Sequence, residues 1–303
     1  MTNNNIAIRT HKLTKSYGRK RGISDITLEV KEGEVFGYLG PNGAGKTTTI
    51  RLLLDFIHPN TGEATIFGHD ISKESVQIRK STGYLPGDLE LYENLTGHEF
   101  LDFAAKIRGN IDQKYVKELC ERLKCDLSVR IRTLSQGNKQ KIGLIQALIH
   151  HPRLIILDEP TSGLDPLIQQ EFYHLIAEVK KEGGTAFIST HILPEAERIC
   201  DRVGIIRNGK LATVEDVNRL KARALREIEI HFDRPVSPDE FAGISGVQNI
   251  RVENNILQCS VIGELDGLVK SASGHRVLNI ISREPNLEKV FLTYYGESEK
   301  SND

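Results

Sequence analysis

The chain has 303 residues, enough for one large domain and a second, smaller one. Its 40 basic and 41 acidic residues leave a net charge of −1, so no general electrostatic argument favours binding to nucleic acid, and we expect no nucleic-acid partner. No apolar run approaches about 18 residues and the polar start has no signal-peptide pattern, so we expect a soluble, intracellular chain. The four cysteines lack metal-ligand spacing and are predicted to be reduced packing residues: Cys120, Cys125, Cys200 and Cys259.

The first 30 residues contain two short runs in which apolar and polar side chains alternate. The runs lie at residues 6–8 and 23–30, on either side of Tyr17-Gly18-Arg19-Lys20. Alternation with a period of two is typical of half-buried strands. We therefore expect two antiparallel strands joined by a turn at residues 17–20.

Residues 35–49 have the order strand, glycine-rich loop, helix. An apolar run ends at Gly40, four residues follow, and Gly45-Lys46-Thr47 opens a segment with apolar residues at helical spacing. Backbone N–H groups in such a loop, with those of the first helical turn, bind phosphate, so Lys46 is expected to reach the β- and γ-phosphates and Thr47 to hold Mg²⁺. The predicted nucleotide-binding residues here are Gly40, Pro41, Asn42, Gly43, Ala44, Gly45, Lys46, Thr47 and Thr48. The alternative is a strand-to-helix turn with an exposed lysine.

The next part of the chain is predicted to be mostly helical. A strand at residues 64–68 precedes a short helix at 75–81 and a mainly helical stretch at 89–150. Thr96 and Glu99 have the spacing of a helix capping box. Ser135 comes just before a periodic apolar stretch that Pro152 ends, so it is expected at a helix N-terminus, where an anion is favoured. For an isolated serine, an ordinary N-cap is the alternative.

Two further apolar runs are predicted to be central parallel strands that end in chemically active side chains. Residues 154–157 lead to Asp158 and Glu159, and residues 185–190 lead to His191. Asp158 is expected to assist a metal ion and Glu159 to polarise a water against the γ-phosphate, with His191 at the same sheet edge. A single acid at a strand end is often a loop residue or a cap, and a lone histidine is more often a surface residue. Asp165, before Pro166, also has a cap as its alternative.

A different pattern begins after a linker at residues 216–226. Residues 227–303 are predicted to alternate as strand, helix, strand, strand, helix, strand, followed by a last helix, which is the order of a ferredoxin-like fold. This part contains no cluster of catalytic residue types, so we interpret it as an accessory or dimer-contact domain.

With these motifs in view, residues 6–215 resemble the nucleotide-binding subunits of ABC transporters. The signature loop of that family matches Leu134-Ser135-Gln136-Gly137-Asn138, and its D-loop matches Ser162-Gly163-Leu164-Asp165. The resemblance implies that Tyr17 stacks on adenine, that Ser135 and Gly137 contact the γ-phosphate held by a second copy, and that His191 is the switch histidine. It also implies an α/β fold in residues 1–215: a P-loop NTPase core with an antiparallel β subdomain and a helical subdomain at about 88–150, followed by the small C-terminal α+β (ferredoxin-like) domain.

The chain departs from the family pattern at three positions. Gly87 stands where a glutamine usually reaches the metal and the attacking water, so either water completes the metal shell or a neighbour such as Asp88 substitutes. Gln136 and Asn138 replace the usual glycine and glutamine of the signature loop. A working but slower signature loop is expected.

The resemblance implies an ATP-hydrolysing subunit with ATP and Mg²⁺ as cofactors. It would act as a head-to-tail pair with a second copy of itself and drive a separate membrane permease, which places it in the cytoplasm on the inner face of the cell membrane. Glu284, Pro285, Leu287, Glu288 and Phe291 match a C-terminal pattern of drug and antibiotic exporters, which favours export.

Two other functions remain open at this point. A non-transport ABC ATPase would act on ribosomes or DNA, but such proteins typically carry tandem cassettes or a long coiled coil, and this chain has one set of motifs. A regulatory module would bind ATP without turnover. Gly87 and the altered signature loop are compatible with it, whereas Glu159 and His191 argue against it.

Overall fold

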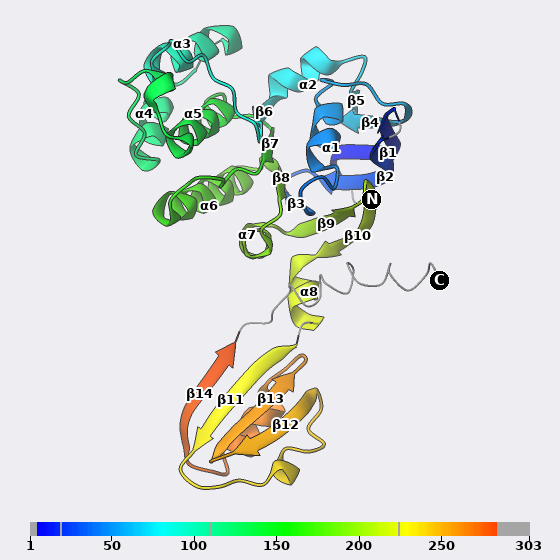
Figure 1. Cartoon of the computed structure of the whole chain (residues 1–303), viewed down its shortest axis with the longest axis vertical. Coiled ribbons are helices and arrows are strands. Elements are labelled where there is room, and N and C mark those ends of the chain that lie inside the picture. Colours follow the sequence, from blue (N-terminus) through cyan, green and yellow to red (C-terminus); the bar gives the residue numbers. More distant parts are fainter. Residues whose placement is uncertain (1–4, 19, 110, 224, 284–303) are drawn as a thin grey trace. The chain divides into compact units, whose positions relative to one another are not determined.

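The computed structural model describes residues 5–18, 20–109, 111–223 and 225–283 (Figure 1). Contacts between Cα atoms divide the chain into two compact units, Met1–Glu215 and Asp216–Asp303. Within the described residues, no helix combines the length and the apolar character that crossing a membrane requires.

A six-stranded sheet forms the centre of the first unit. Its strand order is β10-β9-β3-β8-β7-β6. The strands are β3 (Val35–Leu39), β6 (Thr82–Leu85), β7 (Leu154–Asp158), β8 (Thr185–Thr190), β9 (Arg202–Arg207) and β10 (Lys210–Asp216). Strands β6, β7, β8, β3 and β9 are parallel to one another, and every residue of β3, β7 and β8 is buried, as expected for central strands of a parallel sheet. The carboxyl ends of β3, β7 and β8 therefore meet at one edge.

The second sheet of this unit is antiparallel and contains the two strands predicted at the start of the chain. Its order is β2-β1-β4-β5, from β1 (Ile6–Tyr17), β2 (Lys20–Lys31), β4 (Thr61–Ile66) and β5 (His69–Asp70). Strand β4 ends two residues earlier than expected, because Phe67 (φ 50°) and Gly68 (φ 83°) turn the chain into β5. Helix α1 (Lys46–Leu53) buries Ile50, Leu52 and Leu53 in a core shared with both sheets.

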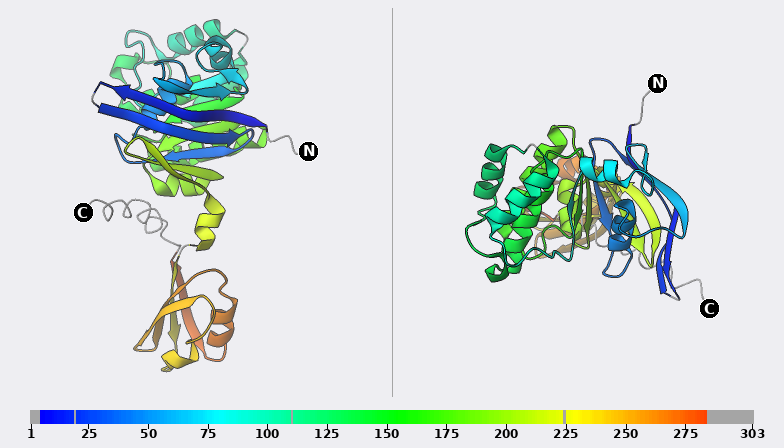
Figure 2. Two further views of the ribbon diagram at one scale, coloured as in Figure 1. Left: turned by 90° about the vertical axis from the view of Figure 1, so that its right-hand side faces the viewer. Right: turned by 90° about the horizontal axis from the view of Figure 1, so that it is seen from above.

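Helices cover the central sheet on the side away from β1 and β2 (Figure 2). They are α5 (Gln136–Leu148), which packs on β6, and α6 (Pro166–Lys181), which packs on β8, with α3 (Gly97–Arg108) and α4 (Gln113–Arg122) beyond them. The predicted capping box is present: Thr96 Oγ1 accepts from Glu99 N at 3.2 Å, and Glu99 Oε2 accepts from Thr96 N at 2.7 Å. Shorter elements are α2 (Ser75–Ser81), α7 (Leu193–Ile199) and a 3₁₀ turn at Ile131–Thr133.

The second unit contains a four-stranded antiparallel sheet. Its order is β12-β13-β11-β14, from β11 (Arg226–Phe232), β12 (Val247–Glu253), β13 (Ile256–Val261) and β14 (Val277–Arg283). Helix α9 (Asp266–Ala272) precedes β14, while the helix expected after β11 is only a 3₁₀ turn at Pro238–Glu240, capped by Ser237. Helix α8 (Val217–Arg223) occupies part of the expected linker. The predicted last helix and the pattern from Glu284 to Phe291 lie outside the described residues.

The four cysteines are free thiols, as predicted. Cys200 and Cys259 are buried, and Cys120 and Cys125 are partly buried. Burial raises the pKa of the Cys125 thiol to about 12, so this side chain stays protonated and unreactive at neutral pH.

Candidate active site

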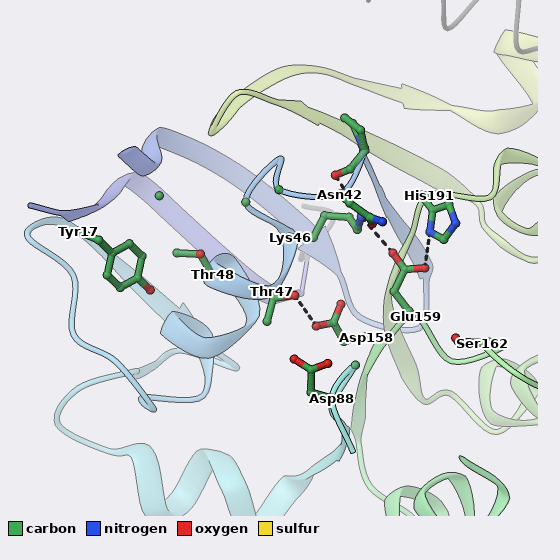
Figure 3. Close-up of a pocket in the computed structure, with 15 residues that line it drawn as sticks. Tyr17, Asn42, Lys46, Thr47, Thr48, Asp88, Asp158, Glu159, Ser162 and His191 are labelled. Carbon is green, nitrogen blue, oxygen red and sulfur yellow. Dashed lines mark hydrogen bonds and ion pairs between the residues drawn. The ribbon is translucent and has the colours of Figure 1, made fainter. Parts of the chain in front are cut away.

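A pocket of about 590 Å³ opens at the edge where β3, β7 and β8 end (Figure 3). Most of the residues predicted to bind nucleotide, metal or attacking water lie in it. The lining residues are Tyr17, Gly22, Pro41, Asn42, Gly43, Gly45, Lys46, Thr47, Thr48, Gly87, Asp88, Asp158, Glu159, Ser162 and His191. Gly40 and Ala44 complete the same loop without lining the pocket.

The loop between β3 and α1 needs its glycines for steric reasons. Gly45 has a φ of 113°, and a Cβ there would lie 2.7 Å from Ile23 Cγ2. A Cβ at Gly40 would lie 2.4 Å from the carbonyl oxygen of Ile206. No side chain caps the N-terminus of α1, so its first N–H groups and the positive end of its dipole face the pocket. This arrangement favours an anion.

Lys46 is the one lysine or arginine among the residues that line the pocket. Its side chain is only 6% exposed, and its ammonium donates to Gly40 O at 2.7 Å. The same ammonium lies 3.0 Å from Glu159 Oε1, in an ion pair without an aligned hydrogen bond. The positive charge is thus fixed between the phosphate loop and the end of β7.

Asp158 is held by two hydroxyl groups from neighbouring elements. Thr47 Oγ1 donates to Asp158 Oδ2 at 2.7 Å, and Ser189 Oγ donates to Oδ1. The carboxylate belongs to a residue that is 1% exposed. Its rotamer is therefore fixed by β8 on one side and α1 on the other.

Glu159 and His191 form a pair at the mouth of the pocket. Glu159 Oε2 lies 2.8 Å from His191 Nδ1, and Glu159 N donates to Ser189 O at 3.0 Å. The backbone of Glu159 is left-handed, with a φ of 51°. Behind it, the amide of the buried Gln140 donates to Glu159 O at 3.3 Å and to Pro160 O at 3.1 Å. Helix α5 therefore supports the turn that presents the Glu159 carboxylate.

A buried carboxylate that sequence reasoning missed lies behind this pair. Glu195 Oε2 accepts from Thr190 Oγ1 at 2.9 Å, and Oε1 accepts from Thr161 Oγ1. Burial raises the pKa of Glu195, which is 6% exposed, and the two hydroxyl donors partly offset that rise. Glu195 thereby joins the residue before His191 to the loop after Glu159. No spacing in the sequence signals this contact.

Tyr17 stands at the end of the pocket formed by the turn after β1. The residue is 47% exposed, and Lys15 Nζ lies 5.7 Å from the centroid of its ring. An exposed aromatic face at one end of a phosphate-binding pocket is available for stacking on a base.

Besides Gly40 and Ala44, three predicted nucleotide-binding residues do not line this pocket. Ser135 caps α5, accepting from Asn138 N at 3.3 Å, and Asp165 caps α6, accepting from Leu167 N and Ile168 N at 3.1 and 3.0 Å. Gly137 packs so closely on the D-loop that a Cβ would lie 2.3 Å from Gly163 O. Ser135 and Asp165 thus act as helix caps in this chain, and both residues are also exposed for other contacts.

Four lining residues were not among the predicted site residues: Gly22, Gly87, Asp88 and Ser162. Ser162 could have been identified, because it belongs to the run that follows Glu159. Gly87 and Asp88 were considered only as a departure from a family pattern. Gly22 carries no signal in the sequence, because its place at the pocket depends on the pairing of β1 with β2.

Comparison with known proteins gives one consistent result. A family model described as ABC transporter matches residues 23–162. The bacitracin transport ATP-binding protein of Bacillus licheniformis is 37% identical over 306 residues, which cover 95% of this chain and 97% of that protein. A solved ATP-binding subunit of an ABC transporter is 31% identical with a TM-score of 0.66, covering 71% of this chain and 92% of the solved one.

A second solved structure supports the fold. It is a dimeric ATP-binding cassette in a post-hydrolysis state with ADP and phosphate, 24% identical, with a TM-score of 0.62 over 69% of this chain and 98% of its own. The predicted α/β cassette fold, with its antiparallel and helical parts, is confirmed. On these matches and on the convergence of the phosphate loop with the acids of β7, the chain belongs to the family of ABC transporter ATP-binding proteins and is an ATP-binding subunit with an ABC ATPase domain.

Proposed function

We propose that the pocket of Figure 3 binds Mg²⁺-ATP and hydrolyses it, and that this hydrolysis drives export through a separate membrane permease. The observation that carries the proposal is the convergence of Lys46, Thr47, Asp158, Glu159 and His191 on one pocket from three strand ends. Phosphoryl transfer to water needs an anion cradle, a metal site and a base in one place. The pocket supplies a candidate for each.

The phosphate end of the pocket can bind and orient the β- and γ-phosphates. The Lys46 ammonium and the uncapped N–H groups of α1 supply positive charge where the triphosphate would carry its negative charge. Lys46 also pairs with Glu159, so a bound triphosphate would compete for the ammonium and free the Glu159 carboxylate to accept a proton.

The residues beside Lys46 fit a magnesium ion. Thr47 and Asp158 present oxygen atoms, the donors that Mg²⁺ prefers. Within the described residues there is no group of three or more His, Cys, Asp or Glu that could hold a metal by itself. Mg²⁺ commonly relies on one or two carboxylates plus substrate phosphates, so this donor set is appropriate. When bound, Mg²⁺ supplies charge compensation for the phosphoryl oxygens.

Glu159 is the proposed general base. Its carboxylate would take a proton from the attacking water, while His191 Nδ1, 2.8 Å away, orients it. Tyr17 is proposed to stack on adenine at the other end of the pocket, a contact that any purine could make.

We propose that two copies of the chain pair head to tail. Ser135 and Asp165 are exposed and Gly137 is partly buried, and none of the three lines the pocket of its own chain, which is the arrangement expected if they complete the pocket of a second copy. The dimeric cassette of similar fold supports this arrangement. Each nucleotide would then lie between Lys46 of one copy and Ser135 of the other.

The permease contact is proposed for an aromatic surface on the helical part. Tyr92 is 59% exposed and meets the Phe103 ring edge to face, with ring centroids 5.7 Å apart, and Ile107 is another exposed residue of α3. Exposed apolar side chains of this kind fit a short amphipathic helix. Through such a contact the chain would lie at the cytoplasmic face of the membrane. The relative named for bacitracin transport supports export of an antibiotic-like compound, because it covers 95% of this chain.

The test is phosphate release from the full chain with Mg²⁺-ATP, wild type beside Glu159→Gln, with molecular mass followed in solution. We expect turnover by the wild type and a loss of about 100-fold or more in Glu159→Gln, which should accumulate as an ATP-bound dimer. Glu121→Gln, on the exposed face of α4, is the matched control and should retain turnover. If Glu159→Gln turns over like the control, Glu159 is not the base.

The same preparation separates the two other functions. Binding of ATP by the wild type without turnover, alone and with membranes of its host, would favour a regulatory module. Turnover stimulated by ribosomes or DNA, with no integral membrane protein co-purifying, would favour a non-transport ATPase. Loss of membrane co-purification in Tyr92→Ala, with turnover retained, would support the proposed permease surface.

A further inference from the structure

Asp88 is a solvent-exposed acidic residue that lines the pocket and has no partner within the part of the chain that the structure describes. It follows β6 by three residues and lines the pocket, and Figure 3 shows its carboxylate directed toward Thr47 and Asp158. Among the described residues it has no hydrogen bond and no ion pair. An unpaired carboxylate that faces a nucleotide-binding pocket is unfavourable for an anion unless a cation lies between them.

Gly87 explains how the backbone brings Asp88 to this position. A Cβ at residue 87 would lie 3.2 Å from Asp158 Oδ2 and 3.3 Å from Asp158 Cγ. Asp158 cannot readily yield, because Thr47 and Ser189 both bond its carboxylate. Without a side chain at 87, the chain passes close to Asp158 and the next residue supplies the polar group.

The charges of the pocket show what this carboxylate would bind. The pocket lining contains three carboxylates, Asp88, Asp158 and Glu159, against the ammonium of Lys46, which is already paired with Glu159. The neighbouring Tyr84 is affected by the same negative charges. Burial, and then the charges of Asp158 and Asp88, raise the pKa of its phenol to about 12. Asp88 and Asp158 therefore act on one small region beside Thr47, where the proposed metal donors lie.

We propose that Asp88 is a positioning residue for the divalent cation that accompanies ATP. It repels the free nucleotide and attracts the hydrated cation at Thr47 and Asp158, so that binding of the triphosphate depends strongly on the metal. This inference rests on the proposed function, because it assumes that the pocket binds Mg²⁺-ATP. The inference assigns the metal-binding role expected at position 87 to the carboxylate of the next residue, because Gly87 has no side chain.

The experiment compares wild type with Asp88→Asn as full chains. Affinity for the β,γ-imido analogue of ATP is measured by calorimetry in EDTA and in Mg²⁺, and Mn²⁺ binding to the analogue-loaded chain is measured by electron paramagnetic resonance. We expect Asp88→Asn to bind the metal-free analogue more tightly and the Mg²⁺ complex more weakly. The ratio of the two affinities should fall about tenfold, and Mn²⁺ binding should weaken in parallel.

Glu90→Gln is the matched control, because Glu90 is an exposed acid on the same segment that does not line the pocket. It should leave the ratio unchanged, and Asp88→Ser should behave like Asp88→Asn. An unchanged ratio in Asp88→Asn, or an equal change in Glu90→Gln, overturns the inference while the proposed function stands. If wild type binds the analogue in neither condition, the proposed function fails and the inference fails with it.

Discussion

Replacing Glu195 tests whether its buried hydrogen bonds stabilise the loops that carry Glu159 and His191. The Glu195 carboxylate is buried between Thr161 and Thr190, and both hydroxyl groups donate to it. Both threonines are also buried, at 4% and 1% exposure. Glu195→Ala leaves two buried hydroxyl groups without an acceptor and opens a small cavity.

The expected loss can be estimated from these contacts. An unsatisfied buried polar group costs about 1–3 kcal/mol, so two of them cost about 2–6 kcal/mol in free energy of unfolding. Glu195→Gln keeps one acceptor oxygen and adds a donor that one threonine oxygen can accept. Because burial raises the pKa of Glu195 and so favours its neutral form, glutamine is a close substitute, and we expect a loss of about 1 kcal/mol.

Urea unfolding of the full chain, followed by far-UV circular dichroism, measures this difference. Glu121→Ala is the control: its carboxylate is 70% exposed in an ion pair of 3.8 Å on α4 and should change stability by less than about 0.5 kcal/mol. Phosphate release should fall in Glu195→Ala and recover in Glu195→Gln, since the latter keeps Thr161 and Thr190 in place. A Glu195→Ala chain as stable as the control would refute the reasoning. Equal losses in the two variants would show that charge, not hydrogen bonding, is what matters.

Two further predictions concern parts of the fold other than Glu159 and His191. Burial lowers the pKa of His150 from 6.5 to about 4, so below pH 6.5 the unfolded chain binds a proton that the folded chain does not; stability should fall as pH drops from about 6.5 to about 4. With allowance for the partial exposure of His150, the free energy of unfolding should fall by about 1–2 kcal/mol. Urea midpoints measured across this pH range should show that His150→Gln lacks this decrease. Gly137→Ala places a Cβ 2.3 Å from Gly163 O, so the N-terminus of α5 and the D-loop must separate, at a cost of about 1–3 kcal/mol despite the better helix propensity of alanine. Gln136→Ala, exposed on the same turn, should be neutral in the same unfolding assay, and equal midpoints for the two alanine variants would contradict the crowding argument.

The strands and helices of the first unit were predictable where a single pattern dominated. The continuous apolar runs before Gly40, Asp158 and His191 could only be buried strands, and parallel strands bring their carboxyl ends to one edge. The capping box of Thr96 was readable because both partners lie within one helical turn. In the second unit the helix after β11 was overpredicted, because only the capping residues around Pro238 signalled it.

Most of the residues that line the candidate site were predictable from the sequence, but the buried residues that hold its loops in place were not. Lys46 begins a helix, Asp158 ends a strand, and Glu159 and His191 each directly follow a strand, positions that a sequence can show. Glu195 and Gln140 act on the site across 34 and 19 positions, through contacts that exist only after α7 and α5 pack on the sheet. Long-range pairings of this kind leave no periodicity in one sequence.

The left-handed backbone of Glu159, the proposed general base, sets a conflict between the proposed reaction and the stability of the fold. A side chain with a Cβ at a φ of 51° costs about 1 kcal/mol that glycine would avoid and asparagine would reduce. Selection of this chain for thermal resistance alone would therefore be expected to exchange Glu159 for glycine or asparagine. On the proposed mechanism, the resulting protein would be more stable and would bind ATP without hydrolysing it. Stabilised variants of such ATPases should therefore be screened for turnover at every round of selection.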